Sequence, residues 1–322
     1  MKNILSELEK QGRIVYKVLK TIRVKLHTPC QFSCHFCHME GNQYSTPIDD
    51  IEKLITILDK FRREMNISEV HFTGGEPSIH PNVIKYIKRC KQEGFDVKMT
   101  TNGVTYLDRY LECIESGLSS LNVSLHTLNP TSLSNTMEPP RSIRWGQKTI
   151  ITTQFLFLKE ISSLISVKVN TCVGSNELDA LEIAEFCETN NLEWRAMNQL
   201  GIPKESYASL SRMSTTLKAV PVEAIVTNGS SSFSITMRVE SGFIFKIKLI
   251  RPFMLASICN NCSLEQNGEC HEYVYGPRLE KEGDRLKVRS CLHRQKEPFV
   301  LPFEDFFQHR IFSEFKEHLL KK

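Results

Sequence analysis

The sequence predicts an α/β protein built on an open, partial (β/α)6 barrel that resembles part of a TIM barrel. Three observations predict it: apolar strand-like runs alternate about six times with helix-like runs, Gly and Pro separate the runs, and polar motifs follow the strands. Such alternation implies parallel strands joined by helical crossovers, and six units are too few for a closed eight-stranded barrel. We expect this barrel at residues 21–201, after a lead-in at residues 1–20 and before a smaller C-terminal α+β region with a group of four cysteines at residues 202–322.

The predicted strands of the barrel are short runs rich in Ile, Val and Leu. The helices between them carry apolar residues at helical spacing, as Ile51, Leu54 and Leu58 do in the first helix. Gly94 and Gly117 end two of these helices. We expect strands at residues 22–26, 69–73, 97–100, 121–125, 166–172 and 192–197. We expect helices at residues 49–61, 81–90, 106–114, 149–161 and 178–190.

The composition changes after the barrel. Residues 206–216 are rich in Ser and Thr and predict a connecting segment that can hold a short helix. Residues 233–239 and 243–250 alternate between apolar and polar side chains, and Glu240-Ser-Gly joins them, which predicts a hairpin. Residues 303–320 predict a final helix.

The overall composition is that of a globular protein, with 40% hydrophobic and 24% charged residues. The net charge of +4 and the sequence pI of about 8.4 fit a small anionic substrate. Without a local basic patch they do not indicate nucleic-acid binding. Charges throughout the first twenty residues do not match a signal peptide, and no apolar run is long enough for a transmembrane helix. We therefore expect a cytoplasmic protein without a membrane partner.

Seven of the eleven cysteines fall in two groups, and the odd total argues against a disulfide framework. Cys30, Cys34 and Cys37 have C-x3-C-x2-C spacing directly after the first predicted strand, a metal-site pattern in a reducing compartment. Three thiolates from one compact loop can bind a four-iron cluster and leave one iron open. A zinc knuckle and three buried cysteines are the alternatives, although structural zinc sites use four ligands grouped in pairs.

Polar motifs also follow the next predicted strands. Gly74-Gly75-Glu76-Pro77 follows the second strand, Thr101-Asn102-Gly103 follows the third, and Ser124 lies in the fourth. In parallel sheets of this kind, ligands bind at the carboxyl ends of the strands. We therefore expect these motifs and the three cysteines to share one site.

Together these motifs resemble those of the radical SAM superfamily, and the resemblance extends over residues 12–294. It implies a [4Fe–4S] cluster on the three cysteines, with S-adenosylmethionine chelating the open iron. It further implies a 5′-deoxyadenosyl radical that abstracts hydrogen from the substrate, and a reductant such as flavodoxin or ferredoxin. The cofactor-binding residues that the resemblance implies are Phe36, Gly74, Gly75, Glu76, Thr101, Asn102 and Ser124.

Other stretches are similar to the GTP cyclase family of molybdenum-cofactor biosynthesis. This resemblance implies a lyase or cyclase activity and a second iron–sulfur cluster on Cys259, Cys262 and Cys291, with an open iron facing the substrate. The stretches that carry it are residues 37–41, 121–125, 167–170, 251–254 and 278–292.

Three basic residues match substrate-contacting residues of the same family. The resemblance implies that Arg23, Lys168 and Arg278 bind the substrate, as expected for a phosphorylated molecule. The sequence also allows plainer roles, with Arg23 pointing outward from its strand, Lys168 in solvent and Arg278 anchoring a loop. If the three residues bind substrate, their side chains should converge on one pocket. In the plainer roles they should not.

The sequence departs from the pattern of that family at several positions. His71 stands where the family has Lys or Arg, His126 stands where it has Asp, and the chain ends in Lys321-Lys322 rather than two glycines. Cys270 is an additional cysteine. As a fourth ligand it would close the second cluster, whereas as a bystander it would leave an iron open for substrate. Four cysteines in one region also allow zinc.

We therefore predict a radical SAM enzyme that acts on an anionic, nucleotide-like small molecule, with GTP as one candidate. The alternative is a tailoring enzyme for a nucleoside natural product or a peptide, although the segment before the first strand is short for the leader-binding domain of many peptide maturases. A third class is a cluster protein that senses iron or oxygen. Such a sensor needs no cofactor pocket, whereas the Gly-Gly-Glu-Pro and Thr-Asn-Gly segments are complete.

Overall fold

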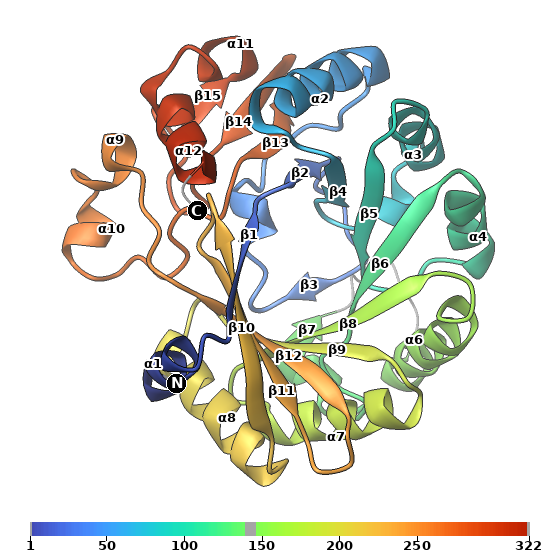
Figure 1. Ribbon diagram of the computed structural model, residues 1–322. Coiled ribbons are helices and arrows are strands. Elements are labelled where there is room, and N and C mark those ends of the chain that lie inside the picture. The colour runs from blue at the N-terminus through green and yellow to red at the C-terminus, as the bar shows by residue number, and fades with distance from the viewer. Residues whose placement is uncertain (1, 139–145, 321–322) are drawn as a thin grey trace.

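The computed structural model describes residues 2–138 and 146–320, and its centre is a curved sheet (Figure 1). Six neighbouring strands of this sheet are parallel and follow the chain in order, which confirms the predicted partial barrel. Because helices join successive strands, the carboxyl ends of all six strands meet at one edge. The six strands are β2 (Thr21–Lys25), β4 (Glu69–Thr73), β5 (Asp96–Thr101), β6 (Leu118–Ser124), β8 (Ser166–Val173) and β9 (Glu193–Asn198).

The connecting helices cover the outer face of the barrel (Figure 1). They are α2 (Ile51–Met65), α3 (Val83–Gln92), α4 (Leu107–Glu115), α6 (Gln147–Ile161) and α7 (Glu177–Thr189). In α2, Asp50 caps the first turn by accepting a hydrogen bond from the Lys53 amide at 2.9 Å. Leu54, Leu58 and Phe61 form the stripe of this helix that is fully buried against the sheet.

The side chains of the six strands alternate between two environments. Val24 and Phe72 are buried beneath the outer helices. Their neighbours Arg23, His71 and Lys98, which are paired in register across β2, β4 and β5, face the barrel interior. The interior of the barrel is therefore polar and rich in basic groups.

The sheet continues beyond the barrel at both edges, to thirteen strands within the described residues. Beyond β9 it adds β12 (Ile244–Ile250), β11 (Ser232–Arg238), β10 (Val220–Asn228) and β1 (Ile14–Val18). Beyond β2 it adds β13 (Arg278–Glu282), β14 (Arg285–Arg289) and β15 (Val300–Pro302). The antiparallel pairing of β11 with β12 confirms the predicted hairpin.

The added strands come from the predicted lead-in and the predicted C-terminal region. β1 pairs with β10 and β13 pairs with β2, so one sheet crosses the expected boundaries at residues 20 and 201. The division into three regions stays a prediction, and residues 321 and 322 of the third lie outside the described residues. The strands β1, β10, β13, β14 and β15 were not predicted, because their pairing depends on partners far away in the sequence.

The segment at residues 206–216, predicted to be a connection that can hold a short helix, lies entirely within one longer helix, α8 (Pro203–Thr216). Pro203 suits the first turn of a helix, and Leu210 and Met213 provide a buried apolar face. Ser206 lies on the same face and accepts a hydrogen bond from the Gln199 amide at 2.9 Å. The Ser and Thr content favours turns by composition, but burial against the sheet decides for the helix.

The single helix predicted at residues 303–320 is instead two helices, α11 (Phe303–Phe306) and α12 (Arg310–Leu320). His309 separates them, and its ring accepts a hydrogen bond from the Ile311 amide at 3.2 Å. The bend lets Phe306, Phe307 and Phe312 pack against one another. This packing explains why an apolar pattern compatible with one helix is interrupted.

The remaining elements are short. A small separate sheet pairs β3 (Ser33–Cys34) with β7 (Met137–Glu138). The other helices are α1 (Lys2–Lys10), η1 (Met39–Gly41), η2 (Pro77–Ile79), α5 (Leu133–Thr136), α9 (Ala256–Cys259) and α10 (Ser263–Gln266). Among the described residues, no helix combines the length and the apolar character needed to cross a membrane.

Candidate functional site

A cavity of about 1190 Å³ lies inside the barrel. Residues from β2 to β13 converge on it, although they are far apart in the sequence. The residues predicted for the first cluster, the cofactor and the substrate all line this cavity: Arg23, Cys30, Cys34, Phe36, Cys37, Gly74, Gly75, Glu76, Thr101, Asn102, Ser124, Lys168 and Arg278. The roles of these residues as ligands stay predictions, but the expectation of one shared site matches the geometry.

The cysteine loop follows β2 and presents three thiols to the cavity. The Cys37 amide donates to the Cys34 carbonyl at 3.0 Å, which closes the turn between them. The backbone amides of Phe32 and Met39 approach the sulfur atoms of Cys30 and Cys37, both at 3.4 Å. Amide donors of this kind stabilise cluster thiolates. Burial raises the pKa of Cys30 to about 11, so a bound cation is needed to ionise this thiol near neutral pH.

The glycine segment after β4 packs directly against the cysteine loop. The Gly75 amide donates to the His27 carbonyl at 2.9 Å, and the Glu76 amide donates to the Pro29 carbonyl at 2.8 Å. A Cβ atom on Gly75 would overlap the backbone of Pro29, and one on Gly74 would overlap the His27 carbonyl. The glycines are therefore needed for the close approach of the cysteine loop, a reason that the sequence did not reveal.

The buried Glu76 carboxylate ties the strand-end motifs together. It accepts hydrogen bonds from the Ser78 amide and hydroxyl at 3.1 and 2.7 Å. It also accepts from the Thr101 hydroxyl at 2.8 Å and the Asn102 amide at 2.7 Å. Burial raises the pKa of Glu76 even though these donors oppose the shift. The carboxylate thus fixes the Thr-Asn-Gly turn beside the cysteine loop, where the Asn102 side chain also donates to Gln31 at 3.0 Å.

Another part of the cavity lining combines aromatic and amide groups. The Phe36 ring packs edge-on against His126 with a centroid distance of 4.7 Å. Burial lowers the pKa of His126 to about 4, so this residue is neutral. Gln154, which the sequence did not single out, donates to the Asn102 and Ser124 carbonyls at 2.7 and 3.2 Å. Gln154 thereby joins the third and fourth strand-end motifs from α6.

Two of the predicted substrate residues share a carboxylate. Arg23 on β2 and Arg278 on β13, which are neighbours in the sheet, both bind Glu40, and Arg278 also binds Glu272. Burial alone raises the pKa of Glu40, but Arg23 and Arg278 outweigh it and hold the pKa well below its ordinary value. Arg23 Nε and Arg278 Nη1 are buried without a hydrogen-bond partner among the described residues. A ligand oxygen could satisfy both donors.

The third predicted substrate residue is also paired. Lys168 lies 3.2 Å from Glu193, which binds Lys246 at the same distance. Close by, His71 contacts the Thr100 hydroxyl at 2.8 Å. Burial, helped by the charge of Arg23, lowers the pKa of His71 well below its ordinary value. The position where the related family carries a positive charge is therefore neutral here.

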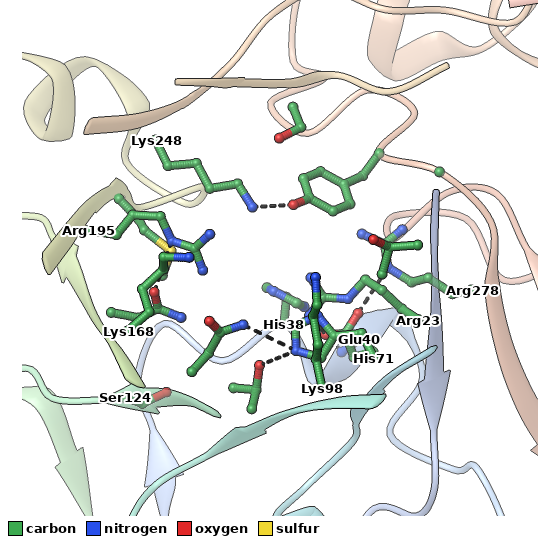
Figure 2. A pocket seen from close by; sticks show the side chains of 18 of the residues that line it. Arg23, His38, Glu40, His71, Lys98, Ser124, Lys168, Arg195, Lys248 and Arg278 are labelled. Atoms are coloured by element: carbon green, nitrogen blue, oxygen red, sulfur yellow. Dashed lines mark hydrogen bonds and ion pairs between the residues drawn. The ribbon is translucent and has the colours of Figure 1, made fainter. Parts of the chain in front are cut away.

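Two cations in the cavity were missed by the sequence analysis. Arg195 and Lys248 form no ion pair with any carboxylate of the described residues. Arg195 Nε instead donates to the Asn170 side chain at 2.9 Å, and Lys248 donates to the Tyr275 hydroxyl. Figure 2 shows Arg195 and Lys248 on one side of the cavity, across from Arg23 and Arg278. Both occupy alternating positions in predicted strands, but only the curvature of the folded sheet shows that they face inward.

Tyr275 lies among these cations in the segment before β13. Lys248, Arg278 and Arg23 lie 4.3, 5.4 and 5.6 Å from the centre of its ring. Burial raises the pKa of Tyr275, but Lys248 and Arg23 outweigh that effect and lower it to about 7. Burial lowers the pKa of Lys248 to about 8. No pattern in the sequence around Tyr275 marked it as a cavity residue.

The four late cysteines gather at a different place. Cys259, Cys262, Cys270 and Cys291 line one small apolar pocket and not the large cavity. The Cys259 thiol lies close enough to the other three that each adds to the rise of its pKa, which burial brings to about 12. Within residues 2–138 and 146–320, no three His, Cys, Asp or Glu side chains lie close enough to enclose a single metal ion.

The radical SAM superfamily model matches residues 24–151, which contain the cysteine loop, the glycine segment and Ser124. Residues 24–151 are thus a radical SAM domain. This radical SAM chain is 24% identical over 312 residues to a probable GTP 3′,8-cyclase of Saccharolobus islandicus, covering 94% of the chain and 91% of the relative. It is 31% identical over 198 residues to a GTP 3′,8-cyclase of Aquifex aeolicus, covering 57% of the chain and 58% of the relative.

Solved structures share the fold of this radical SAM protein. SuiB of Streptococcus suis, bound to its precursor peptide SuiA, matches with a TM-score of 0.57 and 14% identity over 98% of this chain and 70% of that one. The enzyme anSMEcpe with bound AdoMet matches with a TM-score of 0.58 and 11% identity. The match covers 96% of this chain and 84% of anSMEcpe. A second SuiB structure matches over 53% of its length, so this chain spans about half of it. At these identities the likeness concerns the fold.

The cofactors of this radical SAM enzyme are S-adenosylmethionine and a [4Fe–4S] cluster. The residues present fit them, because three thiols and the strand-end motifs share one cavity. Amides already point at two of the sulfur atoms. The three thiols of Cys30, Cys34 and Cys37 would hold three irons of such a cluster and leave the fourth for S-adenosylmethionine.

Proposed function

We propose that this radical SAM enzyme acts on an anionic, nucleotide-like small molecule, with GTP as the first candidate. The observation that carries the proposal is that the cysteine loop and a group of cations share one cavity. The names of the relatives, GTP 3′,8-cyclase, support a nucleotide and a lyase or cyclase reaction. The cations are Arg23, Lys168, Arg195, Lys248 and Arg278.

In this proposal three groups of residues bind the cluster, the substrate and S-adenosylmethionine, respectively. Cys30, Cys34 and Cys37 hold the cluster, and the cations bind the anionic part of the substrate. Together with one electron from a flavodoxin- or ferredoxin-type reductant, the two cofactors supply a 5′-deoxyadenosyl radical that removes a hydrogen atom from the substrate. The residues that bind S-adenosylmethionine are Phe36, Gly74, Gly75, Glu76, Thr101, Asn102 and Ser124.

The radical chemistry is tested by following S-adenosylmethionine itself. Protein reconstituted with iron and sulfide under anaerobic conditions, then reduced with dithionite, is expected to release 5′-deoxyadenosine. Cys34→Ala should abolish the release, whereas Cys187→Ala, which removes a buried thiol that does not line the cavity, should retain it. Turnover by the Cys34→Ala protein at the rate of the unchanged chain would refute the assignment of the cluster.

The substrate is tested separately with deuterated GTP. If GTP is the substrate, deuterium is expected in 5′-deoxyadenosine, because the radical takes a hydrogen atom directly from the bound nucleotide. Deuterium-free 5′-deoxyadenosine formed at saturating GTP would exclude GTP while leaving the radical chemistry in place.

The charge balance of the cavity favours a second candidate, a tailoring enzyme for a nucleoside with a single phosphate or carboxylate. Arg23, Arg278 and Lys168 are already paired with carboxylates, and His71 is neutral. The uncompensated charge therefore suits one anionic group better than a triphosphate. Anaerobic calorimetry with guanosine, GMP and GTP decides: GTP binding at least tenfold tighter than GMP supports the cyclase, and equal affinities support the nucleoside enzyme.

A further inference from the structure

We propose that Lys25 is a positioning residue for the first cluster: its buried ammonium is the counter-charge of the cluster on the cysteine loop and makes that cluster easier to reduce. Lys25 does not line the large cavity, so it acts through the cysteine loop rather than by contact with substrate. The inference rests on the cluster ligands of the proposed function, but it holds for any substrate.

Lys25 ends β2, shortly before the cysteine loop, and is only 1% exposed. Its ammonium donates hydrogen bonds to the Met39 carbonyl at 2.7 Å and to the Asn42 carbonyl. Both carbonyls belong to the turn that follows Cys37, where Met39 and Glu40 hold left-handed conformations with φ of 50° and 53°. Such conformations are uncommon for residues other than glycine, so the two hydrogen bonds help to hold the turn. Lys25 thus ties β2 to the end of the cysteine loop.

The ionic groups packed around Lys25 balance one another without it. Three buried carboxylates pair with three guanidinium groups in this part of the fold, so their charges sum to zero. The paired groups are Glu40, Glu272 and Glu280 with Arg23, Arg278 and Arg289. Within residues 2–138 and 146–320, Lys25 forms no ion pair with a carboxylate, so its ammonium leaves a net positive charge beneath the cysteine loop. Because an uncompensated buried charge is costly, this charge indicates an anion bound at the loop.

Lys25 and Cys37 lie close enough to affect each other's pKa. Burial lowers the pKa of Lys25, while Glu280 and the Cys37 thiolate act to raise it. Burial raises the pKa of Cys37, while the Met39 amide and the Lys25 ammonium act to lower it. Lys25 thus favours negative charge on the sulfur atom of Cys37, as a nearby opposite charge does.

The charge of Lys25 bears directly on electron transfer to the first cluster. A cluster bound by three thiolates is negative, and reduction adds a further negative charge to it. A buried cation nearby stabilises the reduced cluster more than the oxidised one, because the attraction grows with the negative charge. Net charge is one of the features that set the reduction potential of iron–sulfur clusters. The role of Lys25 is therefore to help a flavodoxin- or ferredoxin-type reductant deliver its electron.

The reduction potential of the first cluster tests the inference without any substrate. Lys25→Gln removes the charge but keeps a group that can donate to the two carbonyls. In a mediated redox titration of the reconstituted protein, the paramagnetic resonance signal that S-adenosylmethionine alters reports on the first cluster. The equilibrium constant for its one-electron reduction is expected to fall about tenfold in Lys25→Gln, a shift of about 59 mV to lower potential. An unchanged potential would overturn the inference.

A second variant, Lys25→Met, separates the charge from the hydrogen bonds of the turn, because it removes both. If the charge decides, Lys25→Met and Lys25→Gln should lower the potential equally. A shift in Lys25→Met without one in Lys25→Gln would assign the effect to the hydrogen bonds and refute the role as counter-charge. Urea denaturation of the metal-free proteins shows whether both variants fold, and if only one does, its potential decides against the control below.

Lys98→Gln is the matched control. Lys98 also faces the barrel interior, but Glu69 lies 2.9 Å from its amine and offsets its charge. The potential of the first cluster in Lys98→Gln should therefore equal that of the unchanged chain. An equal shift in Lys98→Gln and Lys25→Gln would show a general effect of lost positive charge and count against a specific role of Lys25.

This inference and the proposed function fail in different ways. A Cys34→Ala protein that still cleaves S-adenosylmethionine would remove the cluster from the cysteine loop, and the inference would fall with it. A cluster that depends on Cys34, but whose potential is the same with and without the charge of Lys25, would refute the inference alone.

Discussion

The large cavity and the pocket of the late cysteines differ in what surrounds their thiols. In the cavity, the thiols of the cysteine loop share a wide space with amides, carboxylates and basic side chains. In the pocket, four thiols meet among mostly apolar groups with room for little else. The contrast teaches that cysteines of one chain lie in two settings: the first group borders a large polar cavity, and the second lies in a small, mostly apolar pocket.

The two regions are joined by a network of paired charges. Glu40 follows the cysteine loop and binds Arg23 and Arg278, while Glu272 binds Arg278 from the segment after Cys270. Glu40 holds a left-handed backbone conformation with φ of 53°, which aims its side chain at both arginines. The network thus fixes the position of one region relative to the other.

Breaking this network is expected to have the largest effect on stability. Glu40→Gln keeps the shape of the side chain but leaves two arginines without their shared charge. Because one partner of a buried ion pair is removed, we expect the free energy of unfolding to fall by roughly 3 kcal/mol. Urea denaturation of the reduced, metal-free protein measures it.

The matched control for this prediction is Glu52→Gln. Glu52 is exposed and paired with Arg89 on the outer helices, so its loss should leave the urea midpoint unchanged. An equal shift of the midpoint in both variants would show that the network adds nothing to the link between the two regions.

The sequence predicted the parts of this comparison that depend on local pattern. The six parallel strands follow from periodicity and turn residues, and the structure confirms them. The cysteine loop and the Gly-Gly-Glu-Pro segment line one cavity, while their roles as ligands stay predictions. The sequence could not predict that Gly75 is required by the backbone of Pro29, because that contact joins the ends of two strands. It also left open whether Cys270 belongs with the other late cysteines, because the loops between them are not periodic.

The inward-facing cations show the same limit. Lys168 was identified through family resemblance, whereas Arg195 and Lys248 were not, although all three lie at alternating positions in strands. Which face of a strand points into a barrel depends on its neighbours, and β12 is joined to β9 only in the folded sheet. The pairing of a cation with a carboxylate is likewise a property of the fold, and it decides which cation is free to bind a ligand.

Removing an unpaired cation should have the largest effect on binding in the cavity. Lys248→Met removes a charge that no carboxylate of the described residues offsets. We expect the affinity for GTP or GMP to fall about tenfold or more, roughly 1.4 kcal/mol. Lys246→Met is the control, since Lys246 lies on the same strand but outside the cavity. Equal affinities of the two variants in anaerobic calorimetry would count against an anion site at Lys248.

The pH dependence of binding should reveal Tyr275. Four cations face its phenol from β12, β9, β2 and β13: Lys248, Arg195, Arg23 and Arg278. With a pKa of about 7, the phenol becomes negative as the pH rises from 6 to 8, and Lys248, with a pKa of about 8, begins to lose its charge. The phenolate repels an anion and the neutral amine no longer attracts one, so the affinity for GMP is expected to fall over this range.

The titration itself is measured by phenolate absorbance near 295 nm in the metal-free protein. The unchanged chain should show one tyrosine titrating near pH 7, and Tyr275→Phe should lack this step. In Lys248→Met the step should move toward higher pH, because this variant lacks the cation that lowers the pKa of Tyr275 most. A first tyrosine step near pH 10 in the unchanged chain would exclude an ionised Tyr275.

The smallest effect is expected for the cation that the resemblance singled out on β8. Glu193 lies 3.2 Å from Lys168 and offsets its charge, so Lys168→Met should weaken GMP binding by less than about threefold, under roughly 1 kcal/mol. The double variant Lys168→Met/Glu193→Gln should bind as the unchanged chain does, because the pair is removed together. If Lys168→Met instead matches the loss seen in Lys248→Met, the ion pair opens when substrate binds. Lys168 would then contact the anion as the family resemblance implies, and the resting charge balance would not describe the occupied cavity.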